Sequence, residues 1–576
     1  IEEGRLFLLQ TRTGKRTGPA AVRLAVDMVQ EGRIDERTAL LRVEPEHLEQ
    51  LLFPVFDLKA KRQALKQGRL LGKGLPAAPG AAAGAIVFFA KDAEARAKTG
   101  EKVILVRHET SPEDIAGMAA AQGILTATGG MTSHAAVVGR GMGKCCVVGC
   151  GAIRIDYQRR EMVVKGKTFA EGAAVSIDGA TGEVIEGGLA TSPSEIVQVL
   201  VKRTLAPDAS PTYTRFAKLL RWADGERRLS VRANADTPED ARAAVAFGAE
   251  GIGLTRTEHM FFGPDRIKAV RMMILAETEE ARKRALDLLE PMQREDFIGI
   301  FEAMGERPVT IRLLDPPLHE FLPQEDEHFA QLARELGVDE RALRQKARAL
   351  HEFNPMLGHR GCRLGLTFPE IYDMQVRALG EAACRVQAKG VRVRPEIEIP
   401  LVGLAKELEV LRERARKIME ETCARNQCRL DYQIGTMIEI PRAALTADEI
   451  AGAAEFFSFG TNDLTQCTFG ISRDDAGSFL PAYEALGIVK RDPFATLDRA
   501  GVGQLMQIAI ERGRRRRPDL VVGICGEHGG DPASIAFCHE AGLDYVSCSP
   551  YRVPIARLAA AQAALTQQGA NLALAH

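Results

Sequence analysis

What the sequence lacks excludes several classes of protein. Lys and Arg (76) almost balance Asp and Glu (77) among the 576 residues, so no excess charge exists to draw the chain to nucleic acid or to an anionic membrane. No run approaches the roughly 18 apolar residues of a membrane helix, and the acidic start Ile1-Glu2-Glu3-Gly4 is unlike a signal peptide. Eleven cysteines are too sparse for a disulfide scaffold. We therefore expect a cytoplasmic protein with reduced thiols that binds neither nucleic acid nor a membrane.

The sequence also lacks an initiating methionine. Residues 5–12 already have the pattern of a strand under way, so we expect a longer natural chain whose first part is missing. Apolar spacing predicts helices at 19–32 and around 46–52. These helices are too small to form a domain, so we expect residues 1–58 to be an N-terminal remnant with linker helices.

The composition that remains is ordinary, with 45% hydrophobic and 27% charged residues, and the length allows about three to five domains. Short apolar runs separated by Gly and Pro predict a compact α/β domain over residues 59–190. Basic, polar residues at 59–72 and a proline-rich stretch at 186–214 flank this domain as candidate linkers. We place a linker at 191–213 and the last domain at 214–576.

Eight strand-like runs alternate with helical stretches in that last domain. The alternation is the sequence form of a (β/α)8 TIM barrel with insertions, and an open, doubly wound sheet is the alternative. Polar residues stand at or just beyond the ends of six runs, where barrel enzymes build their active sites. The eight runs are 229–233, 251–255, 309–313, 396–399, 434–440, 456–460, 520–524 and 544–547.

Arginines at two of these strand ends predict an anion site. Arg256 and Arg312 each follow a buried run, and a guanidinium there fits phosphate or carboxylate. Internal pairing with Asp or Glu is the competing interpretation for both. Arg360 lies in the long insertion after the third run and could close over the same ligand.

Two carboxylates predict a metal site beside those arginines. Glu439 and Asp463 lie one strand–helix unit apart, so both can point into one site. Two carboxylates and a phosphorylated substrate are the usual ligands of Mg²⁺, and a general acid and base pair is the alternative. An anionic substrate needs its charge neutralised, which favours the metal.

Cys525 lies between glycines at another strand end, in Gly523-Ile524-Cys525-Gly526. A thiol has a reference pKa of about 8.5, so at the rim it can donate a proton at neutral pH. A buried, unreactive cysteine is the alternative.

The most distinctive segment is Gly129 to Gly143, which contains Met131-Thr132-Ser133-His134 before a run of small residues. This pattern places the imidazole of His134 at a helix N-terminus, where backbone N–H groups and the helix dipole favour an incoming anion. His134 is therefore a candidate acceptor of a phosphoryl group.

Together these segments resemble the phosphoenolpyruvate-utilising enzymes. The resemblance covers essentially the whole chain and rests on long motifs. They are residues 129–143, 314–321, 435–442, 457–466 and 523–532. It implies a swivelling α/β phosphohistidine domain followed by a TIM barrel, with Mg²⁺ as cofactor, pyruvate and phosphoenolpyruvate as substrates, and a homodimer.

The resemblance also implies individual roles. His134 would carry the phosphoryl group, and Cys525 would protonate the enolate carbon. The other implied roles are phosphoryl binding by Arg256 and Arg312, metal binding by Glu439 and Asp463, and lining of the pyruvate site by Gly460, Thr461 and Asn462.

Within the family, Met131-Thr132-Ser133-His134 favours the dikinase branch over phosphoenolpyruvate synthase and over enzyme I, which passes its phosphoryl group to a protein. A non-catalytic scaffold is a further alternative. The dikinase branch makes phosphoenolpyruvate, AMP and diphosphate from ATP, pyruvate and phosphate. Its nucleotide-binding ATP-grasp domain is represented here only by a remnant, in which Gln10 and Arg12 match the last strand. We therefore expect only the half-reaction of phosphohistidine and pyruvate, with the histidine domain swinging on the linkers at 59–72 and 186–214.

Overall fold

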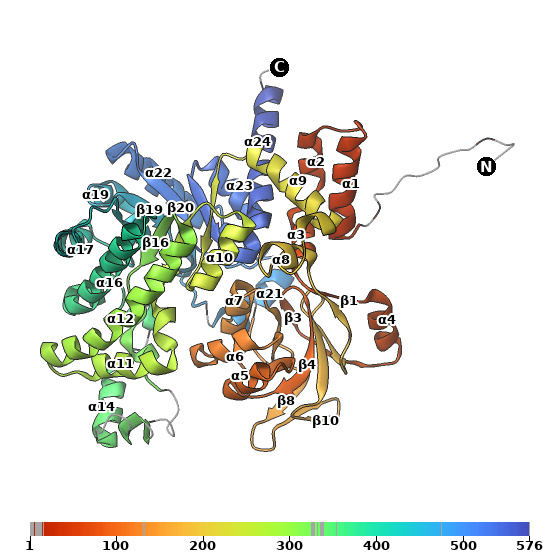
Figure 1. Cartoon of the computed structure of the whole chain (residues 1–576), viewed down its shortest axis with the longest axis horizontal. Coiled ribbons are helices and arrows are strands. Elements are labelled where there is room, and N and C mark those ends of the chain that lie inside the picture. Colours follow the sequence, from red (N-terminus) through yellow and green to blue (C-terminus); the bar gives the residue numbers. More distant parts are fainter. Residues whose placement is uncertain are drawn as a thin grey trace.

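The computed structural model describes residues 16–574 except 131–132, 324–328, 331, 335–338, 353 and 474, and also describes residues 5 and 14. The predicted strand at 5–12, including Gln10 and Arg12, lies outside these residues apart from Arg5. Figure 1 shows a barrel with its helices beside a smaller α/β domain, and a group of N-terminal helices on the barrel.

Eight parallel strands close into a barrel in sequence order, because β14 pairs with both β15 and β21. All eight predicted strand positions are confirmed within one or two residues, and the alternative of an open sheet is wrong. The strands are β14 (Ser230–Asn234), β15 (Ile252–Arg256), β16 (Pro308–Arg312), β17 (Arg394–Ile399), β18 (Gln433–Ile438), β19 (Phe456–Phe459), β20 (Val521–Ile524) and β21 (Tyr545–Cys548).

Local sequence signals fix the helices that surround the barrel. In α10 (Pro238–Phe247), Thr237 Oγ1 accepts a hydrogen bond from Asp240 N at 3.1 Å, and Gly248 ends the helix at φ +96°. An N-cap threonine, a proline at the first position and a terminal glycine are the expected boundaries. The other helices are α11 (Pro264–Leu275), α12 (Glu279–Met304), α14 (Glu340–Leu350), α15 (Cys362–Thr367), α16 (Pro369–Ala388), α17 (Ala405–Arg425), α18 (Pro441–Leu445), α19 (Ala447–Ala451), α20 (Thr461–Phe469), α21 (Leu480–Ala485), α22 (Val502–Arg516), α23 (Pro532–Glu540) and α24 (Val553–Leu574).

The smaller domain is built on an eight-stranded mixed sheet in the order β2-β12-β11-β4-β5-β6-β7-β3. Helices α5 (Ala90–Lys98), α6 (Ile115–Ala120) and α7 (His134–Gly141) belong to this domain. A separate sheet joins β8 (Ile153–Asp156), β9 (Glu161–Val164) and β10 (Lys167–Ala170). The large sheet contains β2 (Leu70–Lys73), β3 (Leu75–Ala78), β4 (Ala81–Val87), β5 (Val103–Arg107), β6 (Gly123–Thr126), β7 (Cys145–Val148), β11 (Ala174–Asp178) and β12 (Glu183–Glu186).

The N-terminal helices α1 (Gly18–Gln30), α2 (Glu36–Arg42) and α3 (Pro45–Leu52) confirm the two predicted helices and add one. They pack on α24 and on α9 (Pro211–Glu226), and their apolar residues join the core of the barrel. Gln562 Nε2 also donates to Leu40 O and Val43 O at 2.7 and 2.8 Å. That residues 1–58 are an ATP-grasp remnant stays a prediction.

The two stretches predicted as linkers contain regular structure. Residues 59–72 lie largely in α4 (Leu58–Lys66) and β2, and Asp57 caps α4 by accepting from Ala60 N at 2.8 Å. Between 191 and 213 lie β13 (Thr191–Ser192), α8 (Glu195–Leu200) and the start of α9, while β13 pairs with β1 (Val55–Phe56). The sequence did not reveal these elements, because they are too short for an apolar period to show, and the role of the two stretches as linkers stays a prediction.

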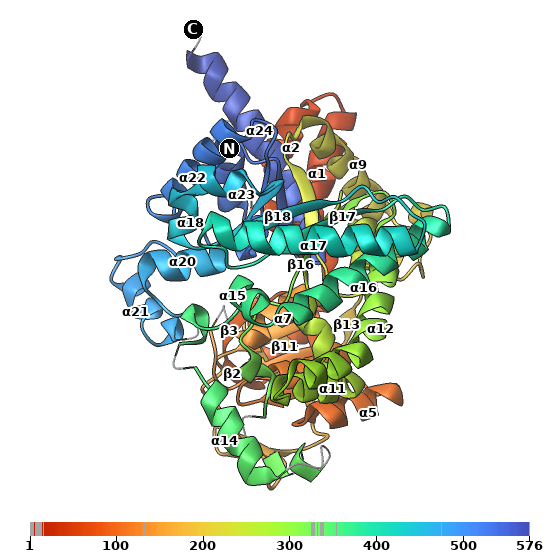
Figure 2. The same ribbon diagram turned by 90° about the vertical axis from the view of Figure 1, so that its left-hand side faces the viewer.

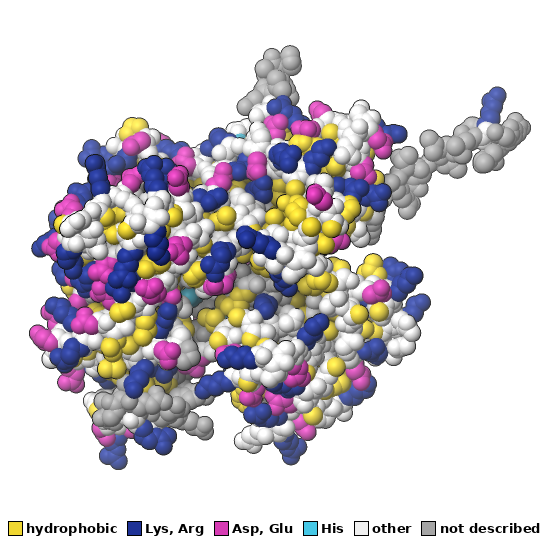
Figure 3. All heavy atoms as spheres, viewed as in Figure 1, with side chains coloured by type: hydrophobic (Ala, Val, Ile, Leu, Met, Phe, Trp, Pro, Cys, Tyr) yellow, Lys and Arg dark blue, Asp and Glu magenta, His cyan; other side chains and the backbone are white. Residues whose placement is uncertain are grey.

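Cys384 and Cys428 form a disulfide, so the expectation of reduced thiols is wrong for this pair. Nine other cysteines are free. In the part of the chain that the structure describes, no helix is both long and apolar enough to span a membrane. Figure 3 shows positive and negative side chains intermixed on the visible face, as the balanced composition predicts.

Candidate active site

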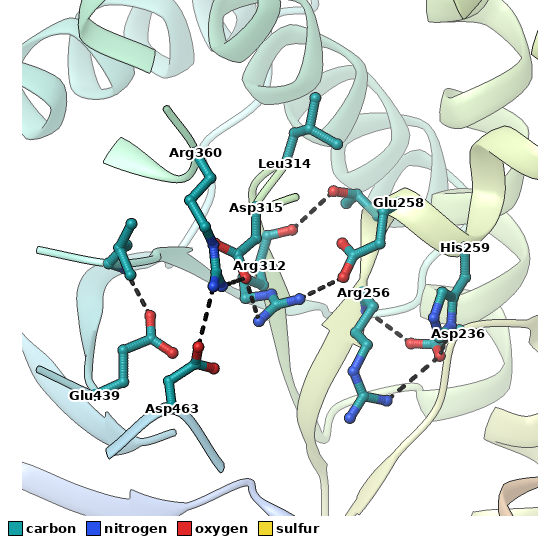
Figure 4. Close-up of polar contacts among 12 residues, drawn as sticks. Asp236, Arg256, Glu258, His259, Arg312, Leu314, Asp315, Arg360, Glu439 and Asp463 are labelled. Atoms are coloured by element: carbon teal, nitrogen blue, oxygen red, sulfur yellow. Dashed lines mark hydrogen bonds and ion pairs between the residues drawn. The ribbon is translucent and has the colours of Figure 1, made fainter. Parts of the chain in front are cut away.

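The C-terminal ends of the barrel strands bring the predicted polar residues to one region (Figure 4). Arg256 and Arg312 are the last residues of β15 and β16, and Glu439 comes directly after β18. After β19, Gly460 precedes α20, and Asp463 lies in the first turn of that helix. The register of the parallel barrel therefore places these side chains at one rim.

Arg312 is held in place by acidic side chains. Its guanidinium donates to Glu258 Oε1, and its Nη1 lies 3.0 Å from Asp315 Oδ2. Arg360 also donates to Asp315, at 2.5 Å from Nη2, and it donates to Asp463 Oδ1 at 3.0 Å. The competing interpretation of internal ion pairing is therefore confirmed for Arg312, and Arg360 is paired in the same way. Arg312 Nε is buried without a partner, so the pairing leaves one of its donors available.

Arg256 lies at the other end of the group, beside Asp236 and His259. Asp236 accepts from Arg256 N at 2.7 Å and from the ring of His259 at 2.7 Å, while Arg256 Nη1 is 3.8 Å from the same carboxylate. The guanidinium of Arg256 thus makes only a long ion pair here and is about one fifth exposed. A free anion has better access to Arg256 than to Arg312.

Glu439 is a fully buried carboxyl group whose charge is only partly compensated. Its Oε1 accepts from Leu401 N at 2.7 Å, while Oε2 has no hydrogen-bond partner. Burial raises the pKa of Glu439 well above its ordinary value, and the nearby charges of Asp463 and Asp315 raise it further. A cation between Glu439 and Asp463 would stabilise both ionised carboxylates, so these residues fit Mg²⁺.

Small and polar groups complete this side of the rim. A Cβ at Gly460 would lie 2.6 Å from Glu439 Oε2, so only glycine leaves room for the carboxylate. Thr461 Oγ1 lies 2.8 Å from His528 Nδ1, and His528 Nε2 lies 2.9 Å from Pro493 O. Since a carbonyl can only accept, Nε2 of His528 carries the proton and Nδ1 accepts from Thr461. Asn462 Oδ1 is buried without a partner.

Cys525 lies inside the mouth of the barrel with Leu254 and Met437, and is 1% exposed. Its Sγ is 3.5 Å from Phe459 O. Burial raises the pKa of this thiol far above its ordinary value, and the charge of Glu398 adds to the effect. The thiol is therefore protonated at neutral pH, as a proton donor must be.

His134 is the first residue of α7, as predicted, and Ser133 is the N-cap. Its Nδ1 lies 2.9 Å from Thr110 Oγ1. Burial lowers the pKa of His134 to about 4, and the charge of His259 contributes. The imidazole is therefore neutral at pH 7, and it lies within electrostatic reach of the rim.

The histidine domain is docked on the barrel in this structure. Glu113 in that domain and Arg271 in α11 approach to 3.4 Å. Gly143 lies so close to Tyr551, in the turn before α24, that a Cβ would be 2.4 Å from Cε2 of the ring. The charge of Arg140 in α7 lowers the pKa of Glu527 at the rim. The histidine domain, which was expected to swing, is therefore in contact with the barrel in this structure.

Sequence reasoning missed several residues of the rim. Glu258 and His259 follow Arg256 after one intervening residue, and two adjacent polar side chains so close to a strand end were a usable signal. Thr110 and Asp236 carried no distinguishing pattern. Glu398 is fully buried in β17 and its pKa is raised to about 8 by burial, a property that depends on barrel closure.

Comparison with known proteins agrees with this architecture. The family model of the PEP-utilising enzyme, PEP-binding domain matches residues 212–565, and the model of the PEP-utilising enzyme, mobile domain matches residues 99–182. The chain belongs to the PEP-utilising enzymes.

Three curated relatives are named pyruvate, phosphate dikinase. The protein from Rhizobium meliloti is 57% identical over 98% of this chain, that from Clostridium symbiosum 55% over 99%, and the chloroplastic form 1 from Arabidopsis thaliana 58% over 98%. The chain spans 61%, 63% and 56% of the length of these relatives, respectively.

Proposed function

We propose that this chain performs the phosphoenolpyruvate half of the pyruvate, phosphate dikinase reaction. The phosphoryl group of phosphoenolpyruvate moves to His134 and leaves the enolate of pyruvate, which takes a proton from Cys525. In the reverse direction, Cys525 removes that proton and phosphohistidine returns the phosphoryl group. The observation that supports this most directly is the docking of the domain of His134 against the barrel whose rim contains Arg256, Arg312, Glu439 and Asp463.

His134 acts as the nucleophile through Nε2. If Nδ1–H donates to Thr110 Oγ1, at 2.9 Å, the lone pair on Nε2 is free to attack phosphorus. The neutral state of the ring follows from its lowered pKa. The P–O bond of phosphoenolpyruvate breaks as the N–P bond forms, so electrons and charge balance between the two groups.

Arg256 and Arg312 bind the phosphoryl group, and the acidic partners of Arg312 hold it in position. Asp315 links Arg312 to Arg360, and Arg360 in turn reaches Asp463, so one network connects the anion site and the carboxylates. A prearranged set of charges lowers the energy of a transition state without reorganising during the reaction.

Glu439 and Asp463 would hold Mg²⁺, which neutralises charge on the phosphoryl and enolate oxygens when it is bound. The buried, unpartnered Oε2 of Glu439 supports this assignment. Gly460, Thr461 and Asn462 line the adjacent pyruvate site. Cys525 reaches the enolate from the barrel interior.

A longer chain with a nucleotide-binding domain would add ATP and phosphate as substrates. The homodimer and the cytoplasmic location stay predictions.

Labelled phosphoenolpyruvate tests the proposal. With Mg²⁺, we expect the label on the peptide that contains His134, no label in His134→Asn, and return of the label to phosphoenolpyruvate when pyruvate is added. Equal labelling of the His134→Asn variant would contradict the proposed function.

A further inference from the structure

Three cysteines that the proposed function does not use lie together outside the barrel. Cys384 is in α16, Cys423 is near the end of α17, and Cys428 is in the connection from α17 to β18. Their sulfur atoms all lie within 4.8 Å of one another. Figure 2 shows α17 crossing α16 on this side of the barrel.

Backbone structure holds Cys428 beside Cys423 independently of the sulfur chemistry. Cys428 N donates to Cys423 O at 3.0 Å at the end of α17. The intervening Gln427 adopts φ +50°, in the left-handed region that non-glycine residues seldom use. Such a conformation persists where surrounding contacts enforce it, so the turn is specifically shaped.

Cys384 and Cys428 are joined, and their Cα atoms are 5.9 Å apart, within the range that disulfides span. Cys423 remains a thiol next to this bond. Cys384 is buried, whereas Cys423 and Cys428 are half-buried, so a small reagent can reach the cluster from their side.

The surroundings of Cys423 favour a thiol that exchanges slowly. Burial raises the pKa of Cys423, and the charge of Glu420 raises it further, although Leu430 N–H bonds to the sulfur. A protonated thiol is a weak nucleophile, so attack on the neighbouring bond requires loss of its proton first.

A metal ion fits this cluster less well. Zn²⁺ in structural sites takes four ligands, and among the described residues only three side chains of the suitable types meet here. Two of the three sulfurs are already bonded to each other and so are unavailable as thiolates.

We propose that Cys384, Cys423 and Cys428 form a thiol–disulfide exchange site that responds to small thiols and disulfides. After Cys423 loses its proton to solvent, its sulfur attacks Cys428 Sγ. The Cys423–Cys428 bond forms, the Cys384–Cys428 bond breaks, and Cys384 leaves as a thiolate that takes up a proton. Two molecules of a small thiol instead reduce the original bond to two protein thiols and become a disulfide.

The disulfide links residues 44 positions apart, and the segment between them includes β17 and all of α17. The state of this bond therefore affects part of the barrel. This segment separates Arg360 from Glu439 in the sequence. A covalent bond that closes a long loop restricts the unfolded chain and so stabilises the folded one. Opening the bond should therefore lower the stability of the segment between Cys384 and Cys428, while every residue of the rim remains present.

The folded protein is first treated as described below, then unfolded and alkylated. Peptide mass spectrometry of the product tests the proposal. Without reductant we expect nine cysteines to be modified after unfolding and a Cys384–Cys428 peptide pair to remain. At about pH 9, where more of the Cys423 thiol ionises, a Cys423–Cys428 pair should appear. Mild treatment with dithiothreitol should release Cys384 and Cys428, and glutathione disulfide should join them again.

Cys423→Ser should keep the Cys384–Cys428 pair and lose the exchanged pair. Cys467→Ser, which removes a half-buried thiol elsewhere on the barrel, is the matched control and should exchange like the wild type. Alkylation of all eleven cysteines in protein prepared and treated without reductant would overturn the proposal, as would equal exchange in Cys423→Ser. Stoichiometric binding of Cd²⁺ by the same unreduced protein that is lost in Cys423→Ser but kept in Cys467→Ser would also overturn it, because bonded sulfurs cannot bind the ion.

Discussion

The barrel rim and the histidine domain hold their reactive groups in different ways. Arg312 and Arg360 are fixed by short contacts to acidic side chains of the barrel itself. His134 has one hydrogen bond within its own domain, and its place at the rim depends on contacts between domains. The rim is therefore preorganised by its own residues, whereas the nucleophile is positioned by docking.

Replacement of the proton donor should have the largest effect on the rim side of this comparison. Cys525→Ala should slow the formation of pyruvate by about 10²- to 10⁴-fold, because general acid catalysis contributes on this scale. Binding of phosphoenolpyruvate should change little, since the thiol acts on the enolate. Turnover and a binding isotherm measure the two separately, with Cys467→Ala as control. Near wild-type turnover would make Cys525 a structural residue.

Replacement of Arg312 should disrupt the preorganised network. Arg312→Ala leaves Glu258 without its buried partner and removes one of the two arginines that pair with Asp315, which costs about 3–5 kcal/mol of stability. Loss of charge at the transition state should also slow the exchange of label between pyruvate and phosphoenolpyruvate by about 10²- to 10³-fold.

A denaturation curve and the exchange rate measure these effects. Arg385→Ala removes a half-exposed ion pair with Glu295 and serves as control, with an expected change of about 0–1 kcal/mol. Equal changes in stability and exchange rate in Arg312→Ala and Arg385→Ala would contradict a special role of the network around Arg312.

Gly143 tests the docking side of the comparison. Gly143→Ala places a methyl group against the ring of Tyr551, and such overpacking costs about 1–3 kcal/mol, so exchange should fall by roughly 5- to 150-fold. Gly100→Ala is a matched control, because Gly100 also follows a helix of the same domain at positive φ but has nothing within 4 Å.

Gly143→Ala with Tyr551→Ala should recover part of the exchange rate, because the smaller side chain removes the clash. Equal losses in Gly143→Ala and Gly100→Ala would show that backbone strain, and not docking, is responsible.

A fall in pH should weaken the docking of the histidine domain on the barrel gradually. The docked His134 has a pKa of about 4, below the ordinary value of about 6.5 that we expect when the domain is released. Above about pH 6.5 the ring is neutral in both states, so docking is at full strength. As the pH falls from about 6.5 to 4, only the released state takes up the proton, so docking weakens by at most about tenfold per unit. Fluorescence transfer between labels on the two domains should show this loss, and His134→Asn should abolish it.

The sequence predicted the barrel well because each strand is a short apolar run followed by a polar residue. Arg256, Arg312, Glu439 and Asp463 could be placed at the rim because each lies at the end of such a run or a few residues after it. Glu258, His259 and Thr110 were missed because their importance arises from side-chain contacts made only after folding.

The short elements within the two candidate linkers could not be predicted, for a physical reason. Helix α4 has four charged residues among its nine and α8 has only six residues, so neither shows a clear apolar period. Their placement depends on capping by Asp57 and Ser194, and on packing against the rest of the chain. The disulfide depends on a similar long-range approach of α16 to the end of α17.

A covalent lock on the docked domain tests the central claim most directly. Glu113 and Arg271 already approach across the two domains through long side chains, so Glu113→Cys with Arg271→Cys, joined by a bis-maleimide linker that contains a reducible disulfide, should hold this arrangement, with Glu113→Cys alone as control. If the docked arrangement is the reactive one, the locked protein should exchange label between pyruvate and phosphoenolpyruvate at close to the wild-type rate, with or without reductant. Loss of exchange in the locked protein, with recovery on reduction, would contradict the account.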